Sequence, residues 1–328
     1  MNKRERVITA LKGGEPDRVP AGFWFHFSGE AAKGQGAIDA HVDYFKKCDL
    51  DMMKIMCDGY FDYPNPLQVE KAADWYKLEP MGPEHPFFKE QVERTRAIAE
   101  AVGGETLVFY TVFAPFSSFR FGYGDELVMR TLREDPKAVC HALDVIAEDN
   151  KMLVKALFEA GADGIYYSVQ GGEKNRFTVE EYRRVITPSD KAVLDYANTL
   201  GEFNILHCCG WAGDRNNIEV WQDYEAAAVN WAVYVEKMGM REGRDFFPNV
   251  KCVLGGLDNT PAGMLYKGTD DELKAEIRRL CAKTGRSGFI LGADCSIPSG
   301  TPYERSRPAT EYRGNFPLPA VLHGIFLR

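Results

Sequence analysis

Sulfur and imidazole side chains follow two of the strands that the sequence predicts. His207 and Cys209 lie two residues apart at the end of one predicted strand, and Cys295 follows the end of another. Because side chains alternate across a strand, His207 and Cys209 share a face, whereas Cys208 points to the opposite one. Imidazole and thiolate suit zinc better than calcium or magnesium, which prefer oxygen ligands. The pattern therefore predicts a zinc site formed by His207, Cys209 and Cys295.

Three ligands from two strand ends would leave the fourth position of a tetrahedral zinc open. An open position is typical of a catalytic zinc, whereas a structural zinc has four protein ligands. The alternative interpretation of His207 and Cys209 is a buried pair of core residues without a metal. Cys208, on the other face, is expected to pack against the surrounding helices as a small apolar side chain.

Polar residues also follow other predicted strands. Asp58 closes the second strand, where a carboxylate can act as general base, orient a ligand or merely form a turn, and we assign it a catalytic role. Asp258 follows the seventh strand, with a helix cap as its alternative role. Gln170 and Glu173 follow the fourth, either in a pocket or in a solvated loop. His26 ends the first strand, as a substrate contact or a core histidine, and we assign substrate binding to His26, Gln170 and Asp258.

The rest of the chain alternates short β-branched or aromatic runs with longer helical segments. Gly, Pro or Asp bounds most of the short runs, as expected for strands. Thr178 and Glu181 form a capping box at one helix start, and Gly161 and Gly201 stand where helices should stop. The predicted strands are roughly 19–27, 51–58, 106–113, 164–169, 203–209, 229–234, 251–256 and 288–293, and the predicted helices include 86–102, 136–160, 178–200 and 270–284.

Eight strands separated by helices predict an α/β fold in which a parallel sheet closes into a (β/α)8 TIM barrel. Each parallel connection needs a crossover, which a helix supplies. A doubly wound open sheet is the alternative architecture. Active sites of such barrels form at the C-terminal ends of the strands, which is where the residues above are expected to meet. No linker or repeat divides the chain, so we expect a single domain over residues 1–328.

Composition excludes several classes of partner. The 328 residues are 45% hydrophobic and 27% charged, which is ordinary for a globular protein, and the net charge is −8. Such a chain is unsuited to nucleic acid or anionic membranes, which attract concentrated positive charge. No apolar run approaches the roughly 18–20 residues that span a bilayer, and the N-terminus lacks the apolar core of a signal peptide. Eight cysteines in this setting favour free thiols and a cytoplasmic location.

Several motifs resemble those of the uroporphyrinogen decarboxylase superfamily. They are Arg-Glu-Arg-Val at 4–7, Pro-Asp-Arg-Val-Pro at 16–20, Gly-Ala-Asp-Gly at 161–164 and Ile-Pro-Ser-Gly-Thr-Pro at 297–302. The resemblance covers most of the chain and implies a β/α barrel, in agreement with the strands counted above. It also implies one of two activities. These are the decarboxylation of porphyrinogens and the zinc-dependent transfer of methyl groups carried by corrinoids or thiols.

The residues that distinguish the two branches depart from the decarboxylase pattern. Decarboxylases carry arginines just after the first strand to bind substrate carboxylates, but no arginine occurs here between Arg18 and Arg94. They place a histidine after the last strand, where residues 292–295 read Gly-Ala-Asp-Cys. They use a tyrosine after the third strand, where residues 118–121 read Ser-Phe-Arg-Phe. Asp58 is the decarboxylase-type residue retained here, and it occurs in both branches.

The methyltransferase branch is matched at its zinc pattern by His207, Cys209 and Cys295. The resemblance therefore implies a zinc-dependent methyltransferase that moves a methyl group between a corrinoid and a thiol or similar acceptor. The corrinoid, as methylcobalamin, would be a substrate or be carried by a partner protein. Two alternatives stay open: a uroporphyrinogen decarboxylase-type lyase, and a non-catalytic tetrapyrrole- or corrinoid-binding barrel with structural zinc. The tail at 303–328 is atypical, because Gly and Pro within 313–319 interrupt the final helix that the family would have.

Overall fold

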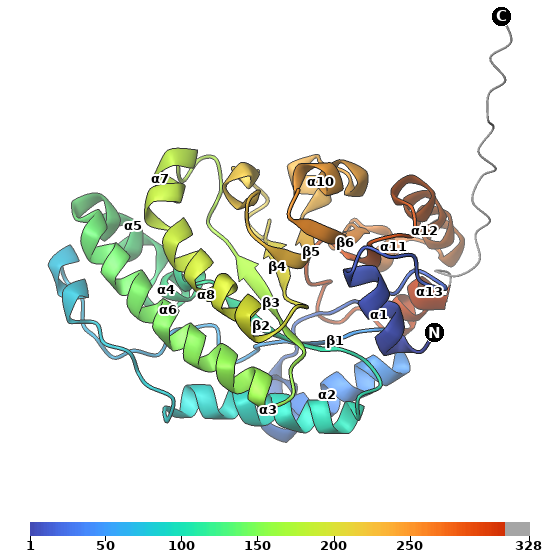
Figure 1. The fold of residues 1–328 in the computed structure, drawn as a ribbon, viewed down its shortest axis with the longest axis horizontal. Helices are drawn as coiled ribbons and strands as arrows, with labels where there is room; N and C mark the ends of the chain where they lie inside the picture. Colours follow the sequence, from blue (N-terminus) through green and yellow to red (C-terminus); the bar gives the residue numbers. More distant parts are fainter. Residues whose placement is uncertain (312–328) are drawn as a thin grey trace, which may run out of the picture.

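The computed structural model describes residues 1–311 and shows a parallel sheet that curls, with helices around it (Figure 1). Every strand pairs in parallel with the next one along the chain, so a crossover connection follows each strand. In the described part of the chain the strands are β1 (Met53–Ile55), β2 (Val108–Phe113), β3 (Gly164–Val169), β4 (Ile205–Cys208), β5 (Ala226–Trp231), β6 (Val250–Leu257) and β7 (Phe289–Ala293).

The segment predicted as the first strand, 19–27, lies between β7 and β1, in the position of the eighth strand of the barrel. Isolated parallel bridges join Ala21 to Leu291 on β7 and Phe25 to Ile297 beyond the end of β7, in place of a continuous ladder. The ladder is interrupted because Pro20 has no amide hydrogen and because the amide of Ala21 donates to the Asp51 carboxylate. The predicted barrel architecture is confirmed, but the prediction that residues 19–27 form a regular strand is wrong.

The buried carboxylate of Asp51 joins the two edges of the barrel. Its oxygens accept hydrogen bonds from the guanidinium groups of Arg6 (2.9 Å) and Arg18 (3.1 Å) and from the amide of Ala21 (2.9 Å). Arg6 also binds Asp17 through two nitrogens, which holds the pKa of Asp17 well below its usual range. The charged residues of the N-terminal family motifs therefore close the barrel rather than contribute to its mouth.

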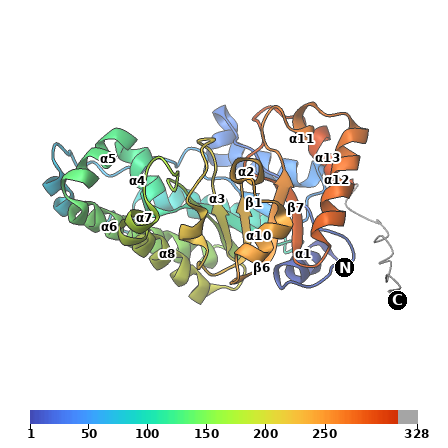
Figure 2. The same ribbon diagram turned by 90° about the horizontal axis from the view of Figure 1, so that it is seen from above.

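Helices cover the outside of the sheet, and Figure 2 shows α4–α8 at one end of the molecule and α11–α13 at the other. None of those between residues 1 and 311 combines the length and apolar character needed to cross a bilayer. The helices are α1 (Lys3–Leu11), α2 (Gly34–Lys47), α3 (Pro86–Val102), α4 (Pro115–Tyr123), α5 (Asp125–Glu134), α6 (Pro136–Glu159), α7 (Val179–Val185), α8 (Thr187–Leu200), α9 (Val233–Glu236), α10 (Met240–Phe246), α11 (Met264–Lys267), α12 (Asp270–Thr284) and α13 (Tyr303–Glu311).

Most predicted boundaries agree with the structure, and the exceptions have local causes. The predicted helix 178–200 is two helices, because Pro188 in the first turn of α8 restarts the backbone after Ile186. The strand predicted at 229–234 is Ala226–Trp231 in the structure. The prediction missed its start because the three alanines there lack the β-branched side chains typical of strands. The helix-breaking stretch at 313–319 lies outside the described residues.

The core has two layers on either side of the sheet. The inner layer fills the barrel and includes Trp24, Met56, Phe109 and Tyr166, all buried. The outer layer lies between the strands and the helices, and it contains Cys208. Alternation along the strands assigns each residue to one layer, as expected for a barrel whose two faces are both covered.

A buried carboxylate in the outer layer carries a hydrogen-bond network. Asp190 on α8 accepts hydrogen bonds from the hydroxyls of Tyr182 (2.9 Å) and Tyr224 (3.3 Å), and its other carboxylate oxygen has no partner among the described residues. The indole of Trp221 donates to the Tyr182 hydroxyl. Among residues 1–311 no cation forms an ion pair with this carboxylate, and burial raises the pKa of Asp190 from 3.8 to about 7.

Asp190→Asn should change how stability depends on pH. Between about pH 4 and about pH 7 the unfolded chain loses the proton of Asp190 while the folded chain keeps it. This residue therefore lowers the free energy of unfolding by up to about 1.4 kcal/mol for each unit of rising pH. Urea unfolding across this range should show a smaller decline with pH in Asp190→Asn than in the wild type. Asp195→Asn, at an exposed position of the same helix, is the control; equal slopes in all three proteins would contradict the prediction.

Candidate metal centre

The C-terminal ends of β4 and β7 bring His207, Cys209 and Cys295 together. The amide of Cys209 donates to Val169 on β3 at 3.0 Å, so the strand geometry continues one residue past β4. Cys295 follows the last residue of β7 by two positions. The Sγ atoms of Cys209 and Cys295 lie 3.9 Å apart, and Cys295 Sγ lies 3.5 Å from His207 Nε2. In residues 1–311 this is the one group of three such side chains close enough to share a metal ion, with all ligand atoms within 4.8 Å.

These distances fit a tetrahedral zinc site. Bonds of about 2.3 Å to sulfur and about 2.0 Å to nitrogen would separate two sulfur ligands by about 3.8 Å and a sulfur from a nitrogen ligand by about 3.5 Å. The observed separations of 3.9 Å and 3.5 Å agree with both values. A disulfide would need the sulfur atoms about 2.05 Å apart, and both cysteines are free thiols. Two thiolates and one imidazole are a donor set that zinc prefers.

Asn230 on β5 holds the imidazole in the orientation that a metal requires. His207 and Asn230 are paired in register across β4 and β5, and His207 Nδ1 donates to Asn230 Oδ1 at 2.6 Å. Tyr166 on β3 donates to the same oxygen at 2.7 Å. With Nδ1 protonated, Nε2 carries its lone pair toward the thiols, which is the tautomer of a histidine ligand.

The amide nitrogen of Asn230 anchors the same side chain to the next two strands. It donates to the carbonyls of Leu254 (2.8 Å) on β6 and Ala293 (3.2 Å) at the end of β7. Gly255 gives the amide its space: its φ is +130°, and a Cβ at this position would lie 2.8 Å from Asn230 Nδ2. A single buried amide thus connects the strand of His207 to the strand that leads to Cys295.

The two thiols differ in their acidity. Hydrogen bonding from Cys209, together with the nearby His207, holds the pKa of Cys295 well below its usual range. The same contact and burial raise the pKa of Cys209, although a hydrogen bond from Gln170 opposes the increase. Cys295 is therefore the thiol that ionises first, and Gln170 contacts the ligand set as well as the pocket.

A cavity of about 90 Å³ adjoins the three side chains on the inner face of the barrel mouth. Aromatic residues form part of its wall, among them Trp24, Tyr166 and the exposed Trp211. Lys54 on β1 also lines it, and burial lowers the pKa of this lysine to about 8. The three candidate ligands therefore face a small, partly apolar space that also contains the side chain of Lys54.

His26 and Asp58 form a pair at the edge of the same cavity. His26 Nδ1 lies 2.7 Å from Asp58 Oδ1, and the other carboxylate oxygen accepts a hydrogen bond from the amide of Phe27 at 2.8 Å. Asp58 is buried, whereas His26 is half-exposed and lines the cavity. The carboxylate thus acts on the cavity through the imidazole, not directly.

Other residues named from the sequence lie away from the ligand set. Asp258 is absent from the lining of the cavity and forms a turn by accepting a hydrogen bond from the amide of Thr260 at 2.8 Å. Glu173 is buried in an ion pair with Arg176. Cys208 lies in the outer layer, as its position on the strand predicts.

Three residues of the site escaped the sequence analysis: Asn230, Tyr166 and Lys54. Asn230 lies within the strand predicted at 229–234, but its pairing with His207 depends on a cross-strand register that local sequence does not give. The sequence does contain a signal for Lys54, because it is a charged residue inside the apolar run 52–56, which contains β1.

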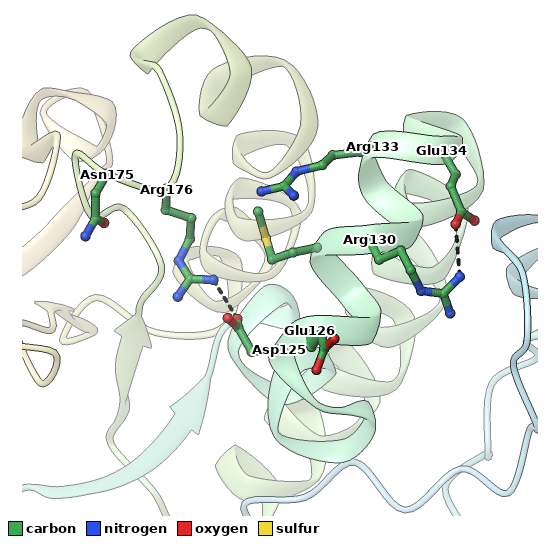
Figure 3. Close-up of a pocket in the computed structure, with 8 residues that line it drawn as sticks. Asp125, Glu126, Arg130, Arg133, Glu134, Asn175 and Arg176 are labelled. Atoms are coloured by element: carbon green, nitrogen blue, oxygen red, sulfur yellow. Dashed lines mark hydrogen bonds and ion pairs between the residues drawn. The ribbon is translucent and has the colours of Figure 1, made fainter.

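A larger hollow, of about 780 Å³, lies between α5 and the loop after β3 (Figure 3). Most of the side chains that line it are charged, and several are ion-paired: Arg176 with Asp125, and Arg130 with Glu134. Neither cysteine nor histidine is among the described residues that line it. Its chemistry is that of a solvated charged surface, so it does not compete with the barrel mouth as the candidate site.

Comparison with curated proteins finds relatives that act on corrinoids. The chain is similar to a methylcobamide:CoM methyltransferase of Methanosarcina acetivorans, with 24% identity over 225 residues, and to its counterpart from Methanosarcina mazei, with 25% identity over 226 residues. Each match covers 69% of this chain and 63% of the relative. The chain therefore matches less than two thirds of the length of these relatives.

Solved structures share the fold. A methyltransferase from Methanosarcina mazei aligns with a TM-score of 0.72 at 16% identity, covering 95% of this chain and 98% of that one. A B12-independent methionine synthase from Shewanella sp. W3-18-1 aligns with a TM-score of 0.58 at 13% identity, covering 90% and 96%. The model of the uroporphyrinogen decarboxylase (URO-D) family matches residues 58–315, which is most of the chain. The chain therefore belongs to the uroporphyrinogen decarboxylase family.

Proposed function

We propose that this protein is a zinc-dependent methyltransferase that moves a methyl group between a corrinoid and a small thiol. The observation that carries the proposal is the arrangement of His207, Cys209 and Cys295, whose spacing suits three corners of a tetrahedral zinc beside a cavity. Zinc in this site would supply a Lewis acid that binds a thiol and favours its deprotonated, nucleophilic form. The similarity to methylcobamide:CoM methyltransferases supports the corrinoid as the other substrate.

The size of the cavity limits which of the two proposed substrates can enter it. About 90 Å³ accommodates a small thiol, whereas pockets for drug-sized ligands measure about 300–1,000 Å³. A tetrapyrrole does not fit inside, so we propose that methylcobalamin on a partner protein presents its methyl group at the mouth. The same limit, together with the thiols at the site, disfavours a porphyrinogen decarboxylase.

The side chains around the cavity each have a role in this proposal. Asn230 keeps His207 in the ligand tautomer, and Gln170 donates to Cys209. His26 donates its Nδ1 proton to Asp58, so its Nε2 is left to accept a proton or hydrogen bond from the incoming thiol. Asp58 is then a positioning residue. Cys208, Cys209 and Cys252 are reduced thiols, which fits a reducing compartment, so a cytoplasmic location is part of the proposal.

Neighbouring cysteines give a matched test of the metal ligands. Purified wild type should contain about one zinc per chain. Cys209→Ala should lose most of this zinc, while Cys208→Ala should keep it, because only Cys209 faces the barrel mouth. Metal analysis measures the content, and circular dichroism checks that both variants fold. Equal loss of zinc in the two variants would contradict the proposed ligand set.

Asn230→Ala should weaken zinc binding without removing a ligand. Loss of the hydrogen bond to Nδ1 frees the ring and its tautomer, and changes of this kind cost about 10- to 100-fold in metal affinity. Competition with a chelator of known affinity measures the change. Asn198→Ala, on α8 away from the barrel mouth, is the control and should keep the wild-type affinity. An unchanged affinity in Asn230→Ala would show that the imidazole needs no such support.

Thiol binding tests whether the proposed zinc has an open position. In weak buffer near pH 7, addition of a small thiol should release about one proton per site, because a free thiol with a pKa of about 8.5 becomes a bound thiolate. X-ray absorption should show sulfur ligands increasing from two to three, and methyl transfer from methylcobalamin should follow. Chelation of the metal or Cys295→Ala should abolish all three signals. Four protein ligands and no response to thiols would identify a structural zinc and refute the methyltransferase proposal.

A further inference from the structure

The charged hollow between α5 and the loop after β3 contains a carboxylate that lies between two arginines. Arg176 Nη1 donates to Asp125 Oδ1 at 2.5 Å (Figure 3), and Arg120 Nε lies 3.3 Å from the same oxygen. Asp125 and Arg176 line the hollow, whereas Arg120, on α4, is buried beside Asp125. Asp125 therefore occupies a position where two guanidinium groups meet.

Arg120 is a buried cation whose hydrogen-bonding groups are largely unused. Only 5% of the residue is exposed, and its Nε and Nη1 have no hydrogen-bond partner among residues 1–311. The ring centroids of Phe116 and Trp211 lie 5.5 Å and 5.8 Å from its guanidinium carbon. Such rings offset only part of the cost of removing the charge from water. Because buried donors are normally paired, Arg120 indicates a ligand of opposite charge.

The first turn of α5 faces the same hollow. The helix begins at Asp125, directly after Gly124, which has no side chain to cap it. Asp125 and Glu126 both line the hollow. Amide groups at the start of a helix, together with the helix dipole, favour an anion. The two arginines and this helix end therefore surround one position with positive potential, and the Asp125 carboxylate supplies a single negative charge there.

The Asp125 carboxylate can leave this position, whereas Arg120 is fixed. The side chain of Asp125 is 51% exposed and that of Arg120 is 4% exposed. An ion pair with a half-exposed carboxylate contributes little stability, so its displacement costs little. Glu173 accepts a hydrogen bond from Arg176 Nε at 2.8 Å, which leaves both Nη atoms for an anion. Arg133 lines the same hollow, and its side chain extends toward that of Arg176 in Figure 3.

We propose that this position binds the phosphate group of a phosphomonoester, which displaces the Asp125 carboxylate and is held by Arg120, Arg176 and the start of α5. A dianion gains more from two guanidinium groups than a carboxylate does, and the planar guanidinium matches phosphate oxygens. The volume of about 780 Å³ has room for the organic part of such a molecule. None of these residues is a candidate metal ligand, so the inference does not depend on the proposed function.

Calorimetry with phenyl phosphate, inorganic phosphate and benzoate tests the site. Wild type should bind phenyl phosphate more tightly than inorganic phosphate, and at least about 10-fold more tightly than benzoate, which is a monoanion of similar size. Arg120→Met and Arg176→Met should each weaken binding of phenyl phosphate by about 10- to 100-fold. Arg130→Met removes a charge that is paired with Glu134 in the same hollow, so it is the matched control and should bind like the wild type. Circular dichroism checks the fold, and Arg176→Met, at a more exposed position, keeps the test decisive if Arg120→Met folds poorly.

Asp125→Asn should change the affinity in the opposite direction. Removal of the competing carboxylate should tighten the binding of phenyl phosphate by about 10-fold. Glu126→Gln makes the same change of charge at the next residue of the helix and should have a smaller effect. Because Trp211 lies against Arg120, binding should also change the tryptophan fluorescence of the wild type, and Trp211→Phe should remove that change.

Several results would overturn the inference. One is the absence of saturable binding of phenyl phosphate by the wild type, and another is equal affinity for phenyl phosphate and either benzoate or inorganic phosphate. Equal losses in Arg120→Met, Arg176→Met and Arg130→Met would show a response to net charge alone, and so would equal effects of Asp125→Asn and Glu126→Gln.

Discussion

The candidate site depends on one buried amide, that of Asn230. Its oxygen accepts hydrogen bonds from Tyr166 and His207, and its nitrogen donates to the carbonyls of Leu254 and Ala293. All these contacts are inside the barrel, where an unpaired amide group would be costly, so the five strand positions are held in one arrangement. The strands that end in His207 and lead to Cys295 therefore reach the mouth of the barrel at matching heights, and the imidazole faces the thiols.

The closure of the barrel is controlled by charge at its other end. Asp51 is buried but is bound by Arg6 and Arg18, and the chain between β7 and β1 joins the sheet at this point. A buried carboxylate with two guanidinium partners is strongly favoured over the same carboxylate with one partner removed. Hydrogen bonding of Ala21 to this side chain replaces part of a strand ladder, so closure is achieved by ion pairs as much as by backbone pairing.

Buried ionisable groups have different surroundings in the inner and outer layers, and this difference indicates which layer contains the candidate site. In the outer layer, Asp190 has only hydroxyl partners, and burial raises its pKa until it is largely neutral below about pH 7. In the inner layer, Lys54 and the two thiols of the candidate metal centre face a common cavity, and each has its pKa altered there. Opposite charges that lie together in a cavity, rather than in a sealed core, are typical of a site that binds a ligand. Membership of the family gives the barrel, but these side chains define what the barrel can do.

The amino-acid sequence alone determined the order of strands and helices, because hydrophobic period, caps and turn residues are local signals. It also predicted that His207, Cys209 and Cys295 would meet, because alternation along a strand and the strand-end rule for barrels need no knowledge of contacts. Helices such as α3 and α12 begin and end where the sequence places them. Asp58 and His26, named for separate roles, form one pair whose geometry local sequence does not contain.

The tertiary structure decided everything that depends on register between strands. Asn230 lies beside His207 only because β4 and β5 pair with one particular offset, and a shift of a single residue would turn its side chain to the other layer. The same holds for Lys54, whose approach to Trp24 and Tyr166 requires the barrel to be closed. These contacts join residues far apart in the chain. Their free energies arise from packing and hydrogen bonds that form on folding, so no local pattern could reveal them.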